Sequence, residues 1–307
     1  MRELIELPRE RRRAALAVTA LLIGAVFIGT SALWVKVSET GPVSTAFWRV
    51  FLALPLLWAW AFAERGRPAW AIPATERRLM LWAGLYFAGD LIVWHWSIVL
   101  TSVANATLLA NLAPIFVTLA AWLLFHRTPS GRFLAGLATA LTGMAVLIEG
   151  DFRLGGGQVL GDALGVVTAM FYAAYQLVVT RLRASVSTAS IMAWSSVITA
   201  AALLPLALAS GERFFPLTDG GWGKLIGLAL VSQVVGQSLI AYAMAHLPST
   251  FSSVGLLFQP VMATLFAWIL LGEKLGWLEI AGAITVLIGI RIVHQAETAR
   301  RAANFSR

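Results

Sequence analysis

Residues 114–143 read PIFVTLAAWLLFHRTPSGRFLAGLATALTG, and residues 260–289 read PVMATLFAWILLGEKLGWLEIAGAITVLIG. Aligned without a gap at an offset of 146 positions, the two stretches are identical at 11 of 30 places, including Pro114 with Pro260 and Gly143 with Gly289. Each stretch is an apolar run, a short polar break and a second apolar run. A repeat spaced by about half of the chain indicates gene duplication and two structurally equivalent halves.

The composition is typical of a protein that lies largely in lipid. Hydrophobic residues make up 59% of the 307 positions and charged residues only 12%, whereas a soluble domain averages roughly 25% charged residues. Several nearly uncharged runs are about 18–24 residues long, which is the length that spans a bilayer as a helix. The runs are continuous and do not alternate with period two, so they do not resemble the strands of a β-barrel. The chain has no cysteine, which excludes disulfides and thiolate sites.

The apolar runs predict an all-α polytopic membrane protein with ten transmembrane helices. Ten helices in two copies give five helices in each copy, and an odd number forces the second copy to enter the membrane from the opposite side. We therefore expect two inverted five-helix repeats around a central cavity, with the first repeat in 1–149 and the second in 150–307. The predicted spans are 14–37, 43–63, 78–99, 101–125, 132–149, 158–180, 188–210, 222–245, 249–271 and 276–294.

The loops carry an asymmetric distribution of Lys and Arg. With the N-terminus inside, 17 of the 23 basic residues fall on the inner side and 5 on the outer side, and Arg49 lies within a span. Cytoplasmic loops carry such an excess, so both termini are expected in the cytoplasm, at a bacterial-type inner (plasma) membrane. A basic face toward anionic lipid also explains the net charge of +8 without any nucleic-acid partner.

Small residues in the last part of each repeat predict close helix packing. In the first copy and then the second, they are Ala135, Thr139, Thr142, Gly143, Ala281, Thr285 and Gly289. We expect these faces to hold helices together and not to bind substrate.

Short motifs recur in the two copies. They are Gly272–Leu275 (GEKL), Ile280–Gly282 (IAG) and Gly289 in the second copy, with Leu134–Gly136 (LAG) and Gly143 in the first. With Trp48-Arg49-Val50 after the turn at Gly41-Pro42, they make the chain resemble the EamA unit of the drug/metabolite transporter superfamily. The first copy departs from this pattern at 126–129 (HRTP). The aromatic density resembles that of bacterial exporters of aromatic and other neutral amino acids. The resemblance implies that helices 1, 3, 4, 6, 8 and 9 line a cavity and that helices 5 and 10 pack outside it.

The third span carries a polar stripe. Tyr86, Asp90 and Trp94 follow one another at intervals of four, so they share one face, and His95 is one residue off it. One interpretation is that Asp90 faces the cavity and binds an amine or a proton. The other is that Asp90 is structural and neutralised by Arg49. His95 either shuttles protons or is a hydrogen-bonded packing residue.

Two prolines occupy equivalent places in the fourth and ninth spans. Pro114 and Pro260 each remove a backbone N–H and free carbonyls in the preceding turn. Freed backbone at membrane depth is tolerated where it is buried or lines a cavity. The prolines therefore indicate either a midplane site, with Asn111, Ser252 and Gln259 beside it, or simple packing kinks.

These arguments define a predicted substrate-binding set of fifteen residues. Its aromatic members would stack on a substrate ring, and the substrate ammonium would lie over a ring face or near Asp90. Gln237, Ser238 and Asn111 would bind the substrate carboxylate. The alternative for the neutral amides and hydroxyls is hydrogen bonding between helices. The full set is Trp34, Tyr86, Asp90, Trp94, His95, Asn111, Tyr172, Tyr175, Gln176, Gln233, Gln237, Ser238, Tyr242, Ser252 and Gln259.

The sequence contains no nucleotide-binding loop, no zinc-protease motif and no nucleophile elbow. We therefore expect no enzyme activity, no cofactor and no metal. The favoured function is a secondary transporter that exports small metabolites, with aromatic or neutral amino acids as the favoured substrates. Two alternatives stay open: an efflux carrier for cationic drugs, and a non-transporting membrane scaffold or intramembrane enzyme. The expected partners are the lipid bilayer, a small-molecule substrate and, if transport is coupled, a proton.

Overall fold

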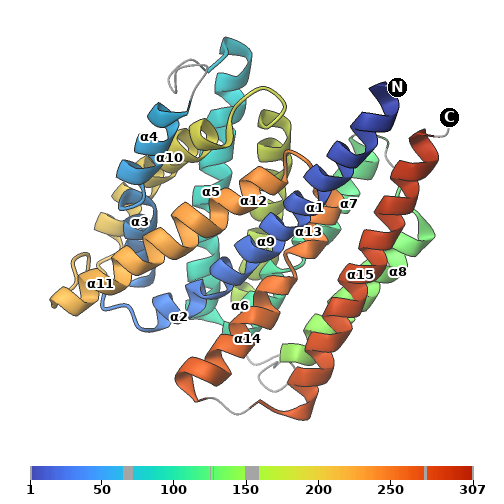
Figure 1. Ribbon diagram of the computed structural model, residues 1–307. Coiled ribbons are helices and arrows are strands. Elements are labelled where there is room, and N and C mark those ends of the chain that lie inside the picture. Colours follow the sequence, from blue (N-terminus) through green and yellow to red (C-terminus); the bar gives the residue numbers. More distant parts are fainter. Residues whose placement is uncertain are drawn as a thin grey trace.

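The computed structural model describes residues 2–64, 72–101, 103–124, 126, 128–148, 159–272 and 275–305. All regular elements in these ranges are helices (Figure 1). In chain order they are α1 (Arg2–Gly29), α2 (Ser31–Lys36), α3 (Pro42–Phe51), α4 (Leu54–Ala63), α5 (Ala74–Leu100), α6 (Val103–Ala110), α7 (Ala113–Leu123), α8 (Gly131–Ile148), α9 (Val159–Leu182), α10 (Thr188–Ala209), α11 (Asp219–Leu228), the π-helix η2 (Ala229–Gln237), α12 (Ser238–Ala243), α13 (Ser249–Gly255), α14 (Phe258–Leu271) and α15 (Trp277–Phe305).

Within these ranges, 8 helical stretches are long and apolar enough to cross a membrane. This confirms the prediction of an all-helical, multi-pass membrane protein. The other two predicted spans are also helical: α8 has a shorter apolar segment, Gly131–Leu147, and α5 has 27 residues but includes polar ones such as Asp90 and His95. The eight stretches are Arg12–Lys36, Pro42–Ala63, Asn105–Leu123, Val159–Leu182, Thr188–Ala209, Asp219–Ala243, Ser249–Leu270 and Trp277–Arg300.

Helices α8 and α15, the last of each repeat, lie side by side at one edge of the molecule (Figure 1). Their backbones are so close that a Cβ added at Gly143 would lie 2.5 Å from the Val286 nitrogen, and one at Gly289 would lie 2.4 Å from the Ala140 nitrogen. The residue numbers rise along α8 as they fall along α15, so the two helices are antiparallel. The four contacts pair Gly136 with Val293, Ala140 with Gly289, Gly143 with Val286 and Leu147 with Gly282.

These four contacts are reciprocal under the repeat offset of 146. Adding the offset to one member of a pair and subtracting it from the other converts the Gly136–Val293 contact into the Gly282–Leu147 contact. Gly143–Val286 converts into Gly289–Ala140 in the same way. A contact that maps onto itself when its two sides are exchanged has local two-fold symmetry. Each side therefore presents the same surface to the other.

The contact surface differs from the small-residue faces that the sequence suggested. Gly143 and Gly289 do lie in it, but Ala135, Thr142 and Ala281 are exposed. The contact instead follows a line one residue further along, through Gly136 and Gly282, because glycine at these positions lets the facing helix approach closely.

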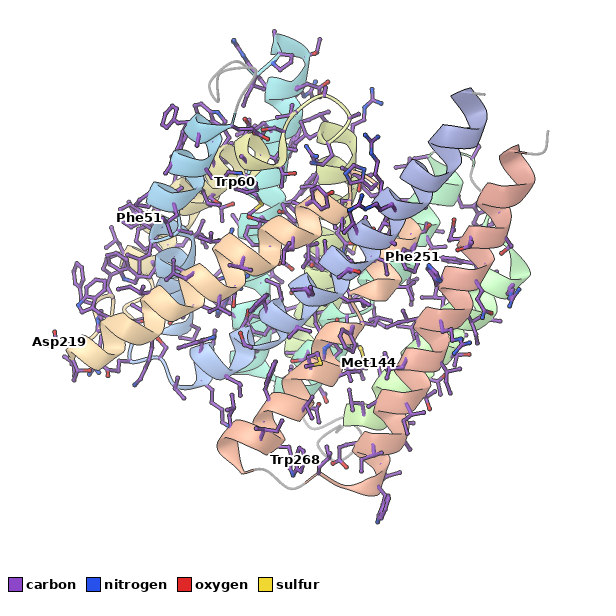
Figure 2. All side chains as sticks on the ribbon, in the orientation of Figure 1. Phe51, Trp60, Met144, Asp219, Phe251 and Trp268 are labelled. Atoms are coloured by element: carbon purple, nitrogen blue, oxygen red, sulfur yellow. The ribbon has the colours of Figure 1, made fainter. Side chains whose placement is uncertain are left out.

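Large side chains fill the space between the α8–α15 pair and the other helices. Met144 of α8 and Phe251 of α13, both labelled in Figure 2, are buried there. The Phe251 ring centroid lies 5.4 Å from that of His294 on α15. The pair is thus packed against the other helices and is not a separate unit.

Several spans are interrupted near their middle. The fourth breaks at 111–112, with Pro114 in the first turn of α7, and the ninth breaks at 256–257, with Pro260 in the first turn of α14. These breaks lie at equivalent positions of the two repeats. The eighth span continues through a π-helix, a form often found at functional sites.

Hydrogen bonds between helices fix α5 against its neighbours. Ser97 Oγ donates to the Gly161 carbonyl of α9 at 2.7 Å, and Thr199 Oγ1 of α10 donates to the Gly84 carbonyl of α5 at 2.9 Å. Such bonds hold helices in register within a membrane protein. They hold α5 between α9 and α10, with Asp90 in electrostatic contact with Tyr172 and Tyr175 of α9.

Candidate functional site

A polar cluster lies where α3, α5, α9, η2 and α14 approach one another. Tyr175 is its centre: its hydroxyl accepts a hydrogen bond of 3.1 Å from Gln237 Nε2, and its ring is stacked on Phe87 at 4.9 Å. The nearly parallel Tyr172 ring lies 6.3 Å away, and Gln259 interacts with the Tyr172 hydroxyl. We use the name polar cluster for Arg49, Asp90, His95, Tyr172, Tyr175, Gln237 and Gln259.

Two opposite charges belong to this cluster. Arg49 of α3 is only 8% exposed, and Asp90 of α5 is partly buried. Arg49 interacts electrostatically with Asp90, and both interact with the two tyrosines. Within the described ranges, however, no ion pair of 4.0 Å or less joins Arg49 to a carboxylate. The two charges therefore face the same tyrosines without a direct contact.

Several buried polar atoms around the cluster have no hydrogen-bond partner in the described part of the chain. Both amide atoms of Gln176 and the Oε1 atom of Gln233 are of this kind, although these side chains are no more than 1% exposed. Since nearly all buried polar groups in proteins are paired, these atoms are available to a polar ligand or to water. Other buried atoms without a partner there include Arg49 Nε, His95 Nε2, Ser238 Oγ and Ser252 Oγ.

Five residues of the predicted set are not members of the polar cluster, although one of them, Trp94, contacts its member His95. Trp34 donates to Thr30 Oγ1 and packs on Gly227 of α11, and the Asn111 amide donates to the Thr107 carbonyl at 2.9 Å. The other three make ring contacts: Tyr86 with Trp82, Trp94 with His95, and Tyr242 with His246. Tyr86 and Trp94 lie on α5 beside the cluster. Among the described residues, the contacts given above for Trp34, Asn111 and Tyr242 do not reach the cluster.

A cleft of about 710 Å³ opens where α7, α8, α9, α13 and α15 meet. Its lining includes Glu297 and Arg300 in the last part of α15, and both chain termini lie at that end of the molecule (Figure 1). The cleft contains none of the fifteen predicted residues. Burial and then the positive charges of Arg183 and Arg13 lower the pKa of His246 in its wall, which favours the neutral imidazole. The polar lining comprises Thr118, Thr180, Arg181, His246, Ser249, Thr250, Glu297 and Arg300.

At the opposite end, two glutamates join the loops of the two halves. Glu39, between α2 and α3, accepts hydrogen bonds from the Leu217 and Thr218 nitrogens and from Thr218 Oγ1 at 2.6 Å. It also lies 3.6 Å from Lys224 Nζ. The Thr218 side chain, then the backbone donors and Lys224, lower the pKa of Glu39 although partial desolvation opposes them.

The second glutamate makes the converse connection. Glu212, between α10 and α11, accepts from the Val43 and Ser44 nitrogens at the start of α3. Glu212 thus caps the first turn of α3, where unpaired N–H groups and the helix dipole favour a negative charge. Glu39 instead binds Leu217 and the N-cap residue Thr218, just before α11. Trp48 adds a bond of 2.7 Å from its Nε1 to the Phe214 carbonyl. We call Glu39, Glu212 and their partners the crossed clamp.

Sequence reasoning identified part of this arrangement. It selected Asp90 and the tyrosines, because polar groups inside apolar spans are conspicuous, but it treated Arg49 only as a neutralising charge. The clamp glutamates and the cleft residues were missed. Acidic residues just before helices, at Glu39 and Glu212, were the available signal for the clamp.

Comparison with known proteins gives the family. The model of the EamA-like transporter family matches residues 15–148 and again residues 159–294. A solved structure described as "Crystal structure of protein" superposes with a TM-score of 0.77 at 18% identity, covering 93% of this chain and 98% of that one. At that identity the likeness shows a shared fold.

Three relatives match over most of their length. An uncharacterized transporter of Archaeoglobus fulgidus is 27% identical over 284 residues, which are 90% of this chain and 94% of that protein. The pseudopaline exporter CntI of Pseudomonas aeruginosa is 26% identical over 216 residues, 70% of this chain and 72% of that protein. A protein named "Probable terminal-alkyne amino-acid exporter" from Streptantibioticus cattleyicolor is 24% identical over 212 residues, 68% and 70%. The two matches to the family model confirm the resemblance expected from the sequence, and the chain belongs to the EamA-like transporter family.

Proposed function

We propose that this transporter exports small metabolites, and that its substrates are amino acids with aromatic or neutral side chains. The observation that carries the proposal is the polar cluster, which combines two opposite charges with two tyrosine rings inside the helix bundle. Relatives named as exporters of pseudopaline and of an amino acid support a metabolite substrate. Asp90 and His95 are the candidate proton carriers. If the transport rate does not change when a pH gradient is imposed, the protein is a facilitator and not a proton-coupled transporter.

We further propose that the two halves, 1–149 and 150–307, are inverted in the membrane and work by alternating access. The antiparallel, reciprocal contact of α8 with α15 supports this arrangement, as do the equivalent breaks before Pro114 and Pro260. In alternating access one side of the transporter is open while the other is closed. The cleft near the termini is the feature expected of the open side, and the crossed clamp at the other end is the feature expected of the closed side. The excess of basic residues near the termini supports a cytoplasmic location for both, in a bacterial-type inner membrane.

This topology predicts opposite labelling of two equivalent loops. The chain contains no cysteine, so single-cysteine variants Ser130→Cys and Gly276→Cys each carry one thiol. We expect a membrane-impermeant thiol reagent added to intact cells to label the Gly276→Cys variant, and to label Ser130→Cys only after permeabilisation. Labelling of both from the same side would contradict the inverted arrangement.

The substrate proposal predicts selective effects of an aromatic truncation. Trp94→Ala should weaken transport of tryptophan or phenylalanine about two- to tenfold in apparent affinity, because one well-placed stacking contact is worth roughly 0.5–1.5 kcal/mol. Alanine transport should change little. Trp96→Ala is the matched control, because Trp96 lies on the same helix but is 49% exposed.

The measurement is counterflow in proteoliposomes, normalised to folded protein. Equal losses for tryptophan and alanine in Trp94→Ala would show that the ring only fills space. Absence of counterflow for every amino acid in the native protein, with exchange of a cationic drug, would replace the proposal by the drug-efflux alternative.

A further inference from the structure

The charges of Arg49 and Asp90 are arranged in an unusual way for a buried pair. Removing a guanidinium and a carboxylate from water is costly, and the usual compensation is a direct, hydrogen-bonded ion pair. Here the two groups attract each other, yet within the described ranges no ion pair of 4.0 Å or less joins Arg49 to a carboxylate. Arg49 Nε is buried and also lacks a hydrogen-bond partner there.

The surroundings of the pair define a common space. Tyr172 and Tyr175 each interact electrostatically with Arg49 and with Asp90, so the four groups surround one region between α3, α5 and α9. The tyrosine rings stand nearly parallel, with an interplanar angle of 12°. The polar cluster therefore combines a buried guanidinium, a carboxylate and aromatic surface.

Two of the three donors that the sequence suggested for a substrate carboxylate are engaged elsewhere, and the third, Ser238 Oγ, has no hydrogen-bond partner among the described residues. The Gln237 amide donates to the Tyr175 hydroxyl, and the Asn111 amide donates to the Thr107 carbonyl. Arg49 retains an unpaired donor in the cluster. A guanidinium is also the side chain whose planar fork matches a carboxylate.

We propose that Arg49 and Asp90 together select zwitterions, with Arg49 binding the carboxylate and Asp90 the ammonium group of the same amino acid. The inference rests on the proposed function and deepens it by naming the residues that recognise the substrate class. A zwitterion brings the complementary two charges and leaves neither side chain uncompensated. An amine alone leaves Arg49 unmatched, and an acid alone leaves Asp90 unmatched, so both are disfavoured. Cationic drugs are excluded on the same ground.

The test compares three compounds that differ only in charge. Tryptophan, tryptamine (no carboxylate) and indole-3-propionate (no ammonium) compete for counterflow in proteoliposomes; leucine, isoamylamine and isocaproate form a second set. In the native protein each zwitterion should bind about tenfold or more tightly than either analogue. Asp90→Asn and Arg49→Gln remove one charge each while keeping a similar size. Arg132→Gln, exposed on α8, is the control.

The proposal predicts a crossed pattern. Asp90→Asn should weaken tryptophan binding about 10- to 100-fold, while the affinity for indole-3-propionate is kept or rises. Arg49→Gln should weaken tryptophan binding by a similar factor, while the affinity for tryptamine is kept or rises. A merely structural role predicts equal loss for all three compounds in both variants, and that result would overturn the proposal. So would a native protein that does not discriminate among the three.

Two further measurements keep the inference independent of folding and of transport. If the single variants fold poorly, the double variant Arg49→Gln/Asp90→Asn can replace them, because it leaves no unmatched charge. It should fold and bind the three compounds without preference. A retained preference for tryptophan would contradict the proposal. Thermal stabilisation of the purified native protein by the same compounds reads binding directly. A crossed pattern in binding without counterflow would support the site and refute the transport function. Counterflow with equal losses for all three compounds would support the transport function and refute the site.

Discussion

Gly289→Ala is expected to reduce the yield of folded protein about tenfold or more. The added methyl group would lie 2.4 Å from the Ala140 nitrogen and 2.7 Å from its Cα, and backbone atoms cannot rotate out of the way. The α8–α15 pair must therefore separate, and overpacking of this kind costs typically about 1–3 kcal/mol. The measurement is the monodisperse fraction in detergent on size-exclusion chromatography, with the melting temperature of what remains.

The matched control is Gly223→Ala, which makes the same change on α11. A Cβ at Gly223 meets nothing within 4 Å, so folding should be unchanged or slightly improved, because alanine favours a helix. Gly143→Ala should resemble Gly289→Ala, since its Cβ would lie 2.5 Å from the Val286 nitrogen. The double variant should be less than additive, because the first change already separates the helices. If Gly289→Ala behaves like Gly223→Ala, the close contact is not required for folding.

Removing both clamp carboxylates is expected to open the end opposite the termini. In a Glu39→Ala/Glu212→Ala protein, α3 loses the acidic cap of its first turn, and the segment just before α11 loses its hydrogen bonds to the other half. We expect labelling of a single cysteine at Ser31 by an impermeant reagent to rise about tenfold, because charge-assisted hydrogen bonds no longer favour the closed state. Ser31 is suitable because it is 8% exposed and bonded to Ser232 when closed.

The control for this experiment is Glu279→Gln, which removes an acidic charge from the start of α15, outside the clamp. The same labelling in the native and double-variant proteins would show that the clamp does not hold this end closed. pH gives a further check. Because the pKa of Glu39 lies below its ordinary value of 4.5, the ionised, bonded form persists above that value and is lost only as pH falls through the lowered pKa. Native labelling should therefore be the same at pH 6 and pH 8 as far as Glu39 is concerned.

The helical architecture could be predicted because two simple physical constraints act on the sequence. Lipid requires apolar helices of a certain length, and duplication repeats them in order. The small-residue face was misplaced by one position, since Ala135 and Gly136 are equally small and only the packing shows which of them faces α15. Interruptions at Pro114 and Pro260 were visible in the sequence because proline removes a backbone donor.

The polar cluster could be predicted only in part. Asp90, Tyr172 and Tyr175 stand out because they are polar residues within apolar spans. That Arg49 faces the same tyrosines as Asp90 depends on how α3 and α5 are rotated, which a single sequence does not encode in any local pattern. The crossed clamp joins Glu39 to Thr218 across 179 positions, and such loop-to-loop contacts have no periodic signal.

The reciprocal contact between α8 and α15 has a consequence for the origin of the chain. In this interface, equivalent residues of the two helices make the same contacts with the opposite helix. Such an interface does not require two different sequences. It forms equally well between two separate, oppositely oriented copies of one five-helix polypeptide, as a homodimer. The glycines at 136 and 143 and their counterparts at 282 and 289 are therefore what a single ancestral gene would have needed to assemble before its copies were fused.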